Sequence, residues 1–152
     1  MTITALYRGK SKKTGKWYYG SYLKLNSSAA RPEHFIVSNY SGIMIEVEPE
    51  TIGQFTGLLD KYNNKVFEDD LLQFGNRILA VYWNDERFQW MAKEAVEYPF
   101  REYPKEDWNY IELGWIAAEV ACVGMMTTPI IGNIYDNPEM YEVTKKEADG
   151  VF

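Results

Sequence analysis

Three consecutive carboxylates, Glu68, Asp69 and Asp70, form a dense acidic cluster in this 152-residue chain. Carboxylate oxygens are ligands that Mg²⁺ prefers, so such a cluster is a candidate cation site. No second cluster in the sequence completes a ligand set, and Asp is also a common turn residue that hydrogen-bonds its own backbone. We therefore predict that the cluster forms a corner between two strands, and we expect no metal.

Residues for nucleophilic catalysis are sparse. His34 is the single histidine and Cys122 the single cysteine, so a Cys–His or Ser–His–Asp arrangement would have to use His34. The sequence around Cys122 does not suggest an electropositive thiolate site, which indicates a buried structural thiol. Gly53 and Gly57 do not follow the spacing of a phosphate-binding loop. We expect no catalytic residue and no cofactor, and therefore no enzyme.

One basic, aromatic stretch, from Lys10 to Tyr22, suggests recognition. Its cations could hold phosphates while its rings stack on bases. The alternative is a solvated hairpin loop followed by a core strand with one aromatic face packed inward. We favour the alternative, because a formal net charge of -6 opposes the binding of polyanions. The candidate binding residues are Lys12, Lys13, Lys16, Trp17 and Tyr19.

The composition indicates a folded, strand-rich protein. Hydrophobic residues make up 46% of the chain and aromatic residues 16%, which is enough for a core and favours strands over helices. The acidic pI of about 4.9 argues against binding nucleic acid through phosphate neutralisation alone. A lone cysteine fits a reducing compartment. The first residues lack a secretory signal pattern, and the apolar stretch from Trp115 to Met126 is too short to span a bilayer. We expect a cytoplasmic protein.

The elements that must position these residues fall into two groups. Residues 1–48 predict a small antiparallel β subdomain, with a basic loop from Arg8 to Lys16 and a polar loop from Lys24 to Glu33. Its expected strands cover residues 3–7, 17–23, 34–38 and 42–47.

The second group, residues 49–141, is organised around the stretch from Val47 to Phe74. The chain should reverse near Tyr62–Asn64 and again at Glu68–Asp70, because Asn tolerates positive φ and Asp favours turns. A two-stranded hairpin alone is marginal in water, so these strands need partners later in the chain. Short strands with tight connections predict an SH3-like small β-barrel. The expected partner strands cover residues 77–83, 88–92 and 130–135, the last of which should close the unit.

Three remaining segments carry different patterns. Residues near 93–114 are charged and broken by Pro99 and Pro104, which indicates an insertion in the barrel subdomain. For residues 115–123, periodicity does not separate a helix from a buried strand. Residues 142–152 form a charged tail that we expect to fray. The predicted fold class is mainly β, with at most short helices, and all parts in one compact unit.

One block of the chain runs from Pro49 to Leu71 and a second block runs from Ile131 to Met140. Together, and in this order, the two blocks resemble the YopX family of phage and prophage proteins. The family has Asn-Gly where this chain has Tyr62–Asn63, and Gly where it has Asp69. Either Asn or Asp makes these turns or the turn is shifted by one residue, and the sequence leaves the register of the hairpin at 62–64 open. The resemblance implies structural roles for Thr51, Gly53, Gly57, Asp60, Glu68, Asp70, Gly132, Asn133 and Pro138.

The resemblance also implies an accessory protein encoded by a phage or prophage and acting in the bacterial host. Our first hypothesis is a non-enzymatic protein-binding or assembly module, with a host or phage protein as partner and self-association through exposed aromatic strand edges. The second is a nucleic-acid-associated small-barrel protein that uses the Lys10–Tyr22 stretch and binds more weakly in high salt. An enzyme built on Glu68, Asp70 or His34 comes last.

Overall fold

The computed structural model of the chain describes residues 5–26, 31–74, 77–94, 110–112 and 128–140. Within these residues the fold is mainly β and antiparallel, with one short 3-10 turn and one helical turn at residues 138–140, as the sequence predicts. The chain divides into two compact units, Met1–Phe55 and Thr56–Phe152. The sequence places the boundary somewhat earlier, after residue 48.

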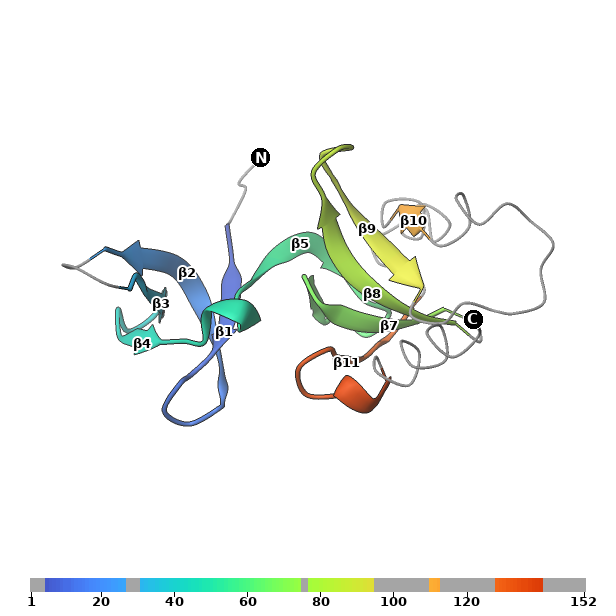
Figure 1. Ribbon diagram of the computed structural model, residues 1–152. Coiled ribbons are helices and arrows are strands. Elements are labelled where there is room, and N and C mark those ends of the chain that lie inside the picture. Colours follow the sequence, from blue (N-terminus) through green and yellow to red (C-terminus); the bar gives the residue numbers. More distant parts are fainter. Residues whose placement is uncertain (1–4, 27–30, 75–76, 95–109, 113–127, 141–152) are drawn as a thin grey trace, which may run out of the picture. The chain divides into compact units, whose positions relative to one another are not determined.

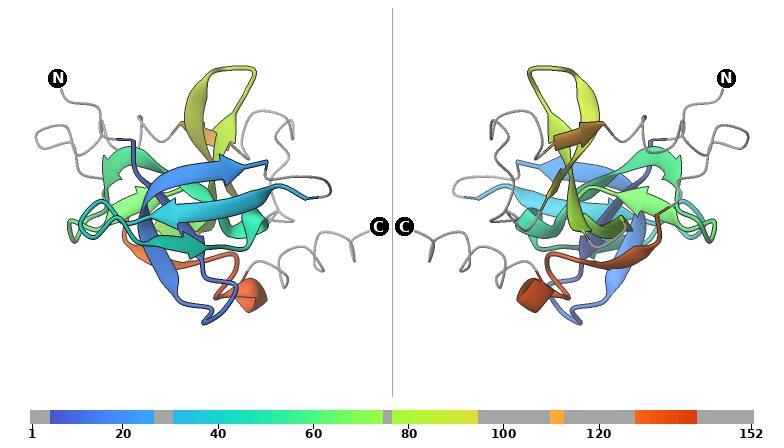
Figure 2. Two further views of the ribbon diagram at one scale, coloured as in Figure 1. Left: turned by 90° about the vertical axis from the view of Figure 1, so that its left-hand side faces the viewer. Right: turned by 90° about the vertical axis from the view of Figure 1, so that its right-hand side faces the viewer.

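The first unit is an antiparallel sheet with the strand order β4-β3-β2-β1-β5, which can be followed in Figures 1 and 2. Aromatic residues, which favour pleated and half-buried surfaces, are the most frequent type in its longest strand, β2. Ile36 and Val47 are fully buried between the strands. The elements are β1 (Tyr7–Lys10), β2 (Trp17–Leu25), β3 (Glu33–Val37), β4 (Met44–Glu46), η1 (Pro49–Thr51) and the start of β5 (Gly53–Leu59).

Strand β1 differs from the sequence prediction, which puts a strand at residues 3–7 and a loop from Arg8 onward. Observed pairing runs from Tyr7 opposite Gly20 to Lys10 opposite Trp17, so Arg8 and Lys10 lie in the strand. The reason is that both cations lie over the Trp17 ring, which gives charged residues a place on a sheet. The loop is therefore shorter than predicted.

The second unit carries the sheet order β10-β9-β8-β7-β11, and β5 ends beside β6. Its core is a cluster of aliphatic side chains from β6, β7, β8 and β9: Val66, Leu72, Leu79, Val81 and Ala92. The apolar strand β8 pairs with β7 on one side and β9 on the other, which confirms it as a central strand. The strands are β6 (Lys65–Phe67), β7 (Asp70–Phe74), β8 (Arg77–Asn84), β9 (Gln89–Glu94), β10 (Tyr110–Glu112) and β11 (Ile130–Asn133).

Strand β11 confirms the prediction that a late segment completes the central unit. Ile130 lies opposite Leu72 and Asn133 opposite Asp70, with a register shift between them. Backbone bonds extend this pairing at both ends, from Gln73 N–H to the Pro129 carbonyl at 3.1 Å and from Ile134 N–H to the Asp69 carbonyl at 3.1 Å. Segments about sixty residues apart in sequence therefore share one sheet.

Other predictions meet the structure only in part. Strands β7 to β11 form an open sheet within the described residues, so the SH3-like barrel is not confirmed. Residues 110–112 form β10 inside the range expected for an insertion. Residues 115–123 and 142–152 lie outside the described part of the chain. No helix in the part that the structure describes is long and apolar enough to cross a membrane.

Candidate functional site

Asp60 follows β5 and is completely buried, with 0% of its surface exposed. Its Oδ1 accepts hydrogen bonds from the backbone N–H groups of Tyr62 (2.9 Å) and Asn64 (2.8 Å). Its Oδ2 accepts from the Asn64 side-chain amide (3.2 Å) and from the Ile130 N–H (3.0 Å). Asn63, at φ 68°, makes the reversal itself. One carboxylate therefore closes the β5–β6 turn and ties it to β11.

These contacts make stability depend on pH. Burial raises the pKa of Asp60, but the hydrogen bonds from Ile130, Asn64 and Tyr62 outweigh burial and hold the pKa below its ordinary value of 3.8. Since the folded pKa is the lower one, the contribution of this carboxylate to stability is present above pH 3.8 and is lost as the pH falls through the folded pKa. We expect the difference in unfolding free energy between the wild type and Asp60→Asn to shrink in that acidic range. Urea unfolding at several pH values measures it, and a difference independent of pH would contradict the assignment.

Thr51 fixes the turn that precedes β5. Its Oγ1 donates to the Glu48 carbonyl at 2.7 Å and accepts from the Lys10 N–H at 2.9 Å, so η1 is bonded to the end of β1. Gly53 opens β5 opposite Arg8. Further along β5, Gly57 has φ 87°, a backbone conformation that glycine adopts without strain.

The acidic cluster Glu68–Asp70 forms the corner between β6 and β7. The Asp70 Oδ2 accepts from the Phe67 N–H at 2.7 Å, and the Asp69 Oδ2 accepts from the Tyr135 hydroxyl at 2.6 Å. Asp69 has φ 68°, where the family resemblance places glycine. Among the described residues, no group of three or more His, Cys, Asp or Glu side chains is arranged to hold a metal ion.

Asn133 locks the turn that follows β11. Its Oδ1 accepts from the N–H groups of Tyr135 (3.0 Å) and Asp136 (2.8 Å), and its own N–H donates to the Asn137 Oδ1 (3.2 Å). Gly132 lies so close to Asn137 that a Cβ at this position would overlap its side chain. These contacts explain why small and amide side chains occupy this corner.

The motif residues are thus distributed over the corners of the fold. Four of them, Thr51, Asp60, Asp70 and Asn133, are buried, and each hydrogen-bonds the backbone of a turn. Pro138 begins the helical turn 138–140, where a missing N–H costs no intrahelical bond. Buried polar groups that are fully hydrogen-bonded specify a fold, and we assign these side chains to that role.

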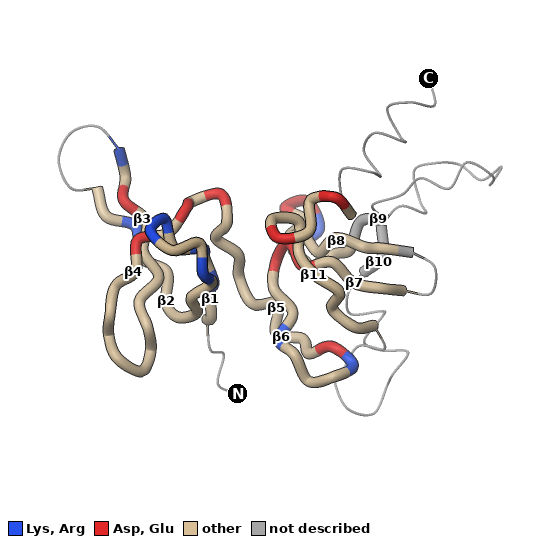
Figure 3. The backbone as a smooth tube through the Cα atoms, turned by 90° about the horizontal axis from the view of Figure 1, so that it is seen from below, with Lys and Arg blue, Asp and Glu red and all other residues tan. Residues whose placement is uncertain are grey.

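The lysines of the predicted binding stretch lie on the loop between β1 and β2, where Figure 3 shows Lys and Arg in blue. The Lys12 Nζ contacts the Glu46 Oε1 at 3.0 Å, and this hydrogen bond raises the pKa of Lys12. Lys13 and Lys16 are exposed, and within the described residues neither has an acidic side chain in ion-pair range. The Ser11 Oγ accepts from the Lys13 N–H at 3.2 Å, which shapes the loop.

The aromatic residues of this stretch have unequal access to solvent. The Arg8 Cζ lies 4.6 Å from the centroid of the Trp17 ring, and the Lys10 Nζ lies 5.5 Å from it. Tyr19, which pairs with Arg8 across the strands, is 50% exposed. Trp17 therefore meets cations of its own chain, while Tyr19 presents a ring to solvent.

His34, the single histidine, lies in β3. Its Nδ1 is 2.7 Å from the Tyr22 hydroxyl, and the two rings stack with centroids 5.9 Å apart. The imidazole thus contacts a tyrosine through both one ring nitrogen and one face. Cys122, the other candidate for a nucleophilic pair, lies outside the described residues.

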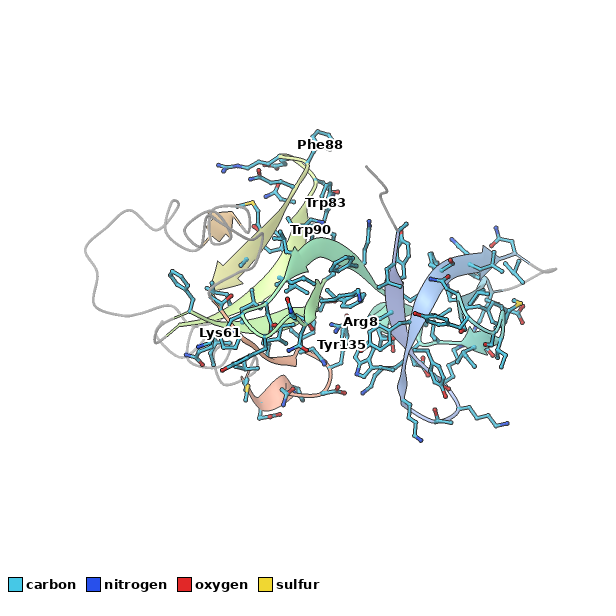
Figure 4. All side chains as sticks on the ribbon, turned by 180° about the vertical axis from the view of Figure 1, so that it is seen from behind. Arg8, Lys61, Trp83, Phe88, Trp90 and Tyr135 are labelled. Atoms are coloured by element: carbon cyan, nitrogen blue, oxygen red, sulfur yellow. The ribbon has the colours of Figure 1, made fainter. Side chains whose placement is uncertain are left out.

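An exposed aromatic surface occurs at the end of the β8–β9 hairpin, and we call Trp83, Phe88 and Trp90 the aromatic tip. Trp83 lies opposite Trp90, with edge-to-face rings 5.2 Å apart. Phe88 is 79% exposed and has φ 52°. Figure 4 shows Phe88 at the end of the hairpin and both tryptophans nearer its base.

The sequence predicts a strand over residues 88–92, and this is wrong for Phe88, because the strand begins at Gln89. The Asn84 Oδ1 accepts from the N–H groups of Glu86 and Arg87, so an Asn-initiated turn occupies residues 84–88. A turn beginning at Asn84 can be predicted from the sequence, because asparagine is a common turn residue. The positive φ of Phe88 cannot be predicted in this way, because the usual backbone conformation of phenylalanine is extended.

The described residues form two open antiparallel sheets, and buried polar side chains hydrogen-bond the turns of these sheets. The protein is therefore of the mainly β class. The chain belongs to the YopX family: the family model, described as YopX protein, matches residues 6–142. Among solved structures, the crystal structure of protein EF1440 from Enterococcus faecalis is similar, with 20% identity and a TM-score of 0.44, covering 92% of this chain and 99% of that chain. No curated protein matches the chain.

Proposed function

We propose that this chain is a phage-associated accessory protein that acts as a non-enzymatic protein-binding or assembly module in the cytoplasm of the bacterial host. Membership of the YopX family suggests the phage association. The observation that carries the binding role is the positive φ of Phe88 together with the exposure of its ring.

Phe88 combines two features that work against stability. A bulky residue at positive φ is strained by about 1 kcal/mol or more, and its ring is left in water. Glycine or asparagine would make the same turn with less strain. Stability alone would favour glycine or asparagine at position 88. The phenylalanine ring that is present there instead suits contact with another molecule.

The two tryptophans extend this surface toward the core. Trp90 packs partly against the core cluster, whereas Trp83 is more open to solvent. Residues that dominate binding energy at protein interfaces are enriched in Trp and Tyr, and they work best when held rigidly. An edge-to-face pair across two strands provides that rigidity.

The polar motif side chains support the non-enzymatic part of the proposal. The carboxylates of Asp60 and Asp70 accept hydrogen bonds from turn backbone, which occupies oxygens that a general base would need. We therefore propose no catalytic group, metal or cofactor at these corners.

A capture experiment tests the proposal. The immobilised full chain is exposed to a lysate of lysogenic bacteria, and the bound proteins are identified by mass spectrometry. We expect the wild type to retain a defined host or phage protein and Phe88→Gly to lose at least about 90% of it, since removal of one hot-spot residue weakens binding tenfold or more.

The matched control is Tyr40→Ser, which removes a fully exposed ring from the first unit. We expect this control to retain the partner. Equal recovery by the wild type and Phe88→Gly, or recovery of no specific protein by the wild type, would overturn the proposal.

A second candidate, a nucleic-acid-associated small barrel, is favoured by one observation. Lys13 and Lys16 lie exposed in the loop that leads into β2, and Tyr19 within β2 is half-exposed, a combination that suits phosphate contacts with one stacked base. It predicts binding to a labelled single-stranded oligonucleotide that weakens steeply with salt and with the Lys13→Ala and Lys16→Ala substitutions. Binding that is absent at low salt removes this candidate.

A further inference from the structure

We infer that the aromatic tip docks on a protein surface of net positive charge, and that carboxylates of the second unit steer this encounter. The inference deepens the proposed function and rests on it, because it names the chemistry of the partner that the aromatic tip would bind. Its support is a pattern of charge, which is independent of the positive φ and the exposure of Phe88.

The two units of the chain carry opposite net charge. Residues 1–55 contain seven Lys and Arg against four Asp and Glu, a formal net charge of +3. Residues 56–152 contain nine Lys and Arg against eighteen Asp and Glu, a formal net charge of -9. Charge that serves solubility alone could lie anywhere on a chain. Here the acidic excess belongs entirely to the unit that carries the aromatic tip.

Two of these carboxylates lie in the turn that carries Phe88. Asp85 and Glu86 are exposed, and the same turn contains one cation, Arg87. The Asn84 Oδ1 accepts from the Glu86 N–H at 3.0 Å and from the Arg87 N–H at 2.9 Å, so side-chain hydrogen bonds fix the backbone of this turn. The tip therefore combines an exposed ring with a net negative charge.

The other carboxylates of the unit act on an approaching partner through solvent. A unit of about 100 residues has a radius of gyration of about 13 Å. The Debye length is about 10 Å at 0.1 M salt and about 30 Å at 0.01 M salt, so at low ionic strength the whole unit presents its negative charge to the partner. At higher ionic strength, only charges close to the contact still act, such as those of Asp85 and Glu86.

The ring and the charges around it contribute to different steps of binding. Loss of a contact at the centre of an interface mainly speeds dissociation, whereas charges at its rim speed the encounter and set its salt dependence. Negative potential around Phe88 favours a partner surface of positive potential and disfavours an acidic one. A protein that presents Lys and Arg around an apolar contact is therefore the occupant with complementary chemistry.

The test adds kinetics on the isolated partner to the capture experiment. The lysate is treated with nuclease, so that nucleic acid cannot bridge the chain to other proteins. The protein whose recovery depends on Phe88 is then identified and purified, and surface plasmon resonance gives its association and dissociation rates on the full chain. We expect the association rate to fall at least about tenfold between about 20 mM and about 300 mM NaCl.

Asp85→Asn combined with Glu86→Gln is the test variant, because it removes two charges and keeps the size of both side chains. We expect the association rate at low salt to fall about threefold or more, and the dissociation rate to change by less than about twofold. The matched control, Glu33→Gln combined with Glu50→Gln, removes the same charge from exposed positions of the first unit. It should change the association rate by less than about 1.5-fold.

An association rate independent of salt, or a test variant that associates as fast as the matched control, would overturn the inference and leave the proposed function in place. Phe88→Gly should act mainly on the dissociation rate, which separates the role of the ring from that of the charges. Recovery of no protein that depends on Phe88 would overturn both, since the inference concerns the partner of the same surface.

Discussion

Replacing Asp60 by alanine is expected to lower the free energy of unfolding by about 3–4 kcal/mol, because several donors lose a charged acceptor at once. The carboxylate is fully buried and accepts from Tyr62, Asn64 and Ile130. Small domains are stable by only about 5–15 kcal/mol, so a large share of the stability would be lost. Urea unfolding followed by tryptophan fluorescence measures the change.

Asp85→Ala is the matched control for this substitution. Asp85 lies exposed in the β8–β9 turn, and surface changes of this kind usually alter stability by less than about 0.5 kcal/mol. If Asp60→Ala and Asp85→Ala behaved alike, the assignment of Asp60 as the residue that ties the β5–β6 turn to β11 would be wrong.

Replacing Gly20 by alanine is expected to destabilise the first unit by about 3 kcal/mol, at the upper end for overpacking. A Cβ at Gly20 would overlap the backbone carbonyl of Val37, on the neighbouring strand β3. A carbonyl held in a sheet cannot rotate away as a side chain can, so β2 and β3 must separate locally. Thermal unfolding monitored by circular dichroism gives the change in stability.

Gly15→Ala separates steric overlap from backbone strain. Gly15 has φ 68° and no heavy atom near the position of a Cβ, so alanine there meets strain alone and should cost about 1 kcal/mol. A loss at Gly20 no larger than the loss at Gly15 would mean that β2 and β3 tolerate the added methyl group.

Much of the fold could be predicted from the sequence, because short-range chemistry sets it. Asn63 and Asp69 both adopt positive φ, as expected for residues that replace glycine at turns. The apolar stretch at 77–83 had to be central, since both of its faces need cover, and β8 is central. Because the hairpin near residue 60 needs partner strands, the sequence predicts a late strand at 130–135, and β11 is that strand.

The remaining features depend on contacts that a linear pattern does not contain. Arg8 and Lys10 read as loop residues, and only the Trp17 ring across the sheet makes them strand residues. All nine motif residues were named from the family resemblance, but the backbone groups that Thr51, Asp60, Asp70 and Asn133 bind were not evident from the sequence. The aromatic tip was missed because the turn includes Phe88, one residue further than its polar sequence suggests.

The central claim is that the fold gives up stability at Phe88 in order to present its ring. The most direct measurement is the free energy of unfolding of Phe88→Gly compared with the wild type, from urea titrations under identical conditions. We predict that the variant is more stable by about 0.5 kcal/mol or more, because glycine relieves the strain at φ 52°. A variant less stable than the wild type by about 1 kcal/mol would show that the ring anchors the hairpin, and would contradict the account.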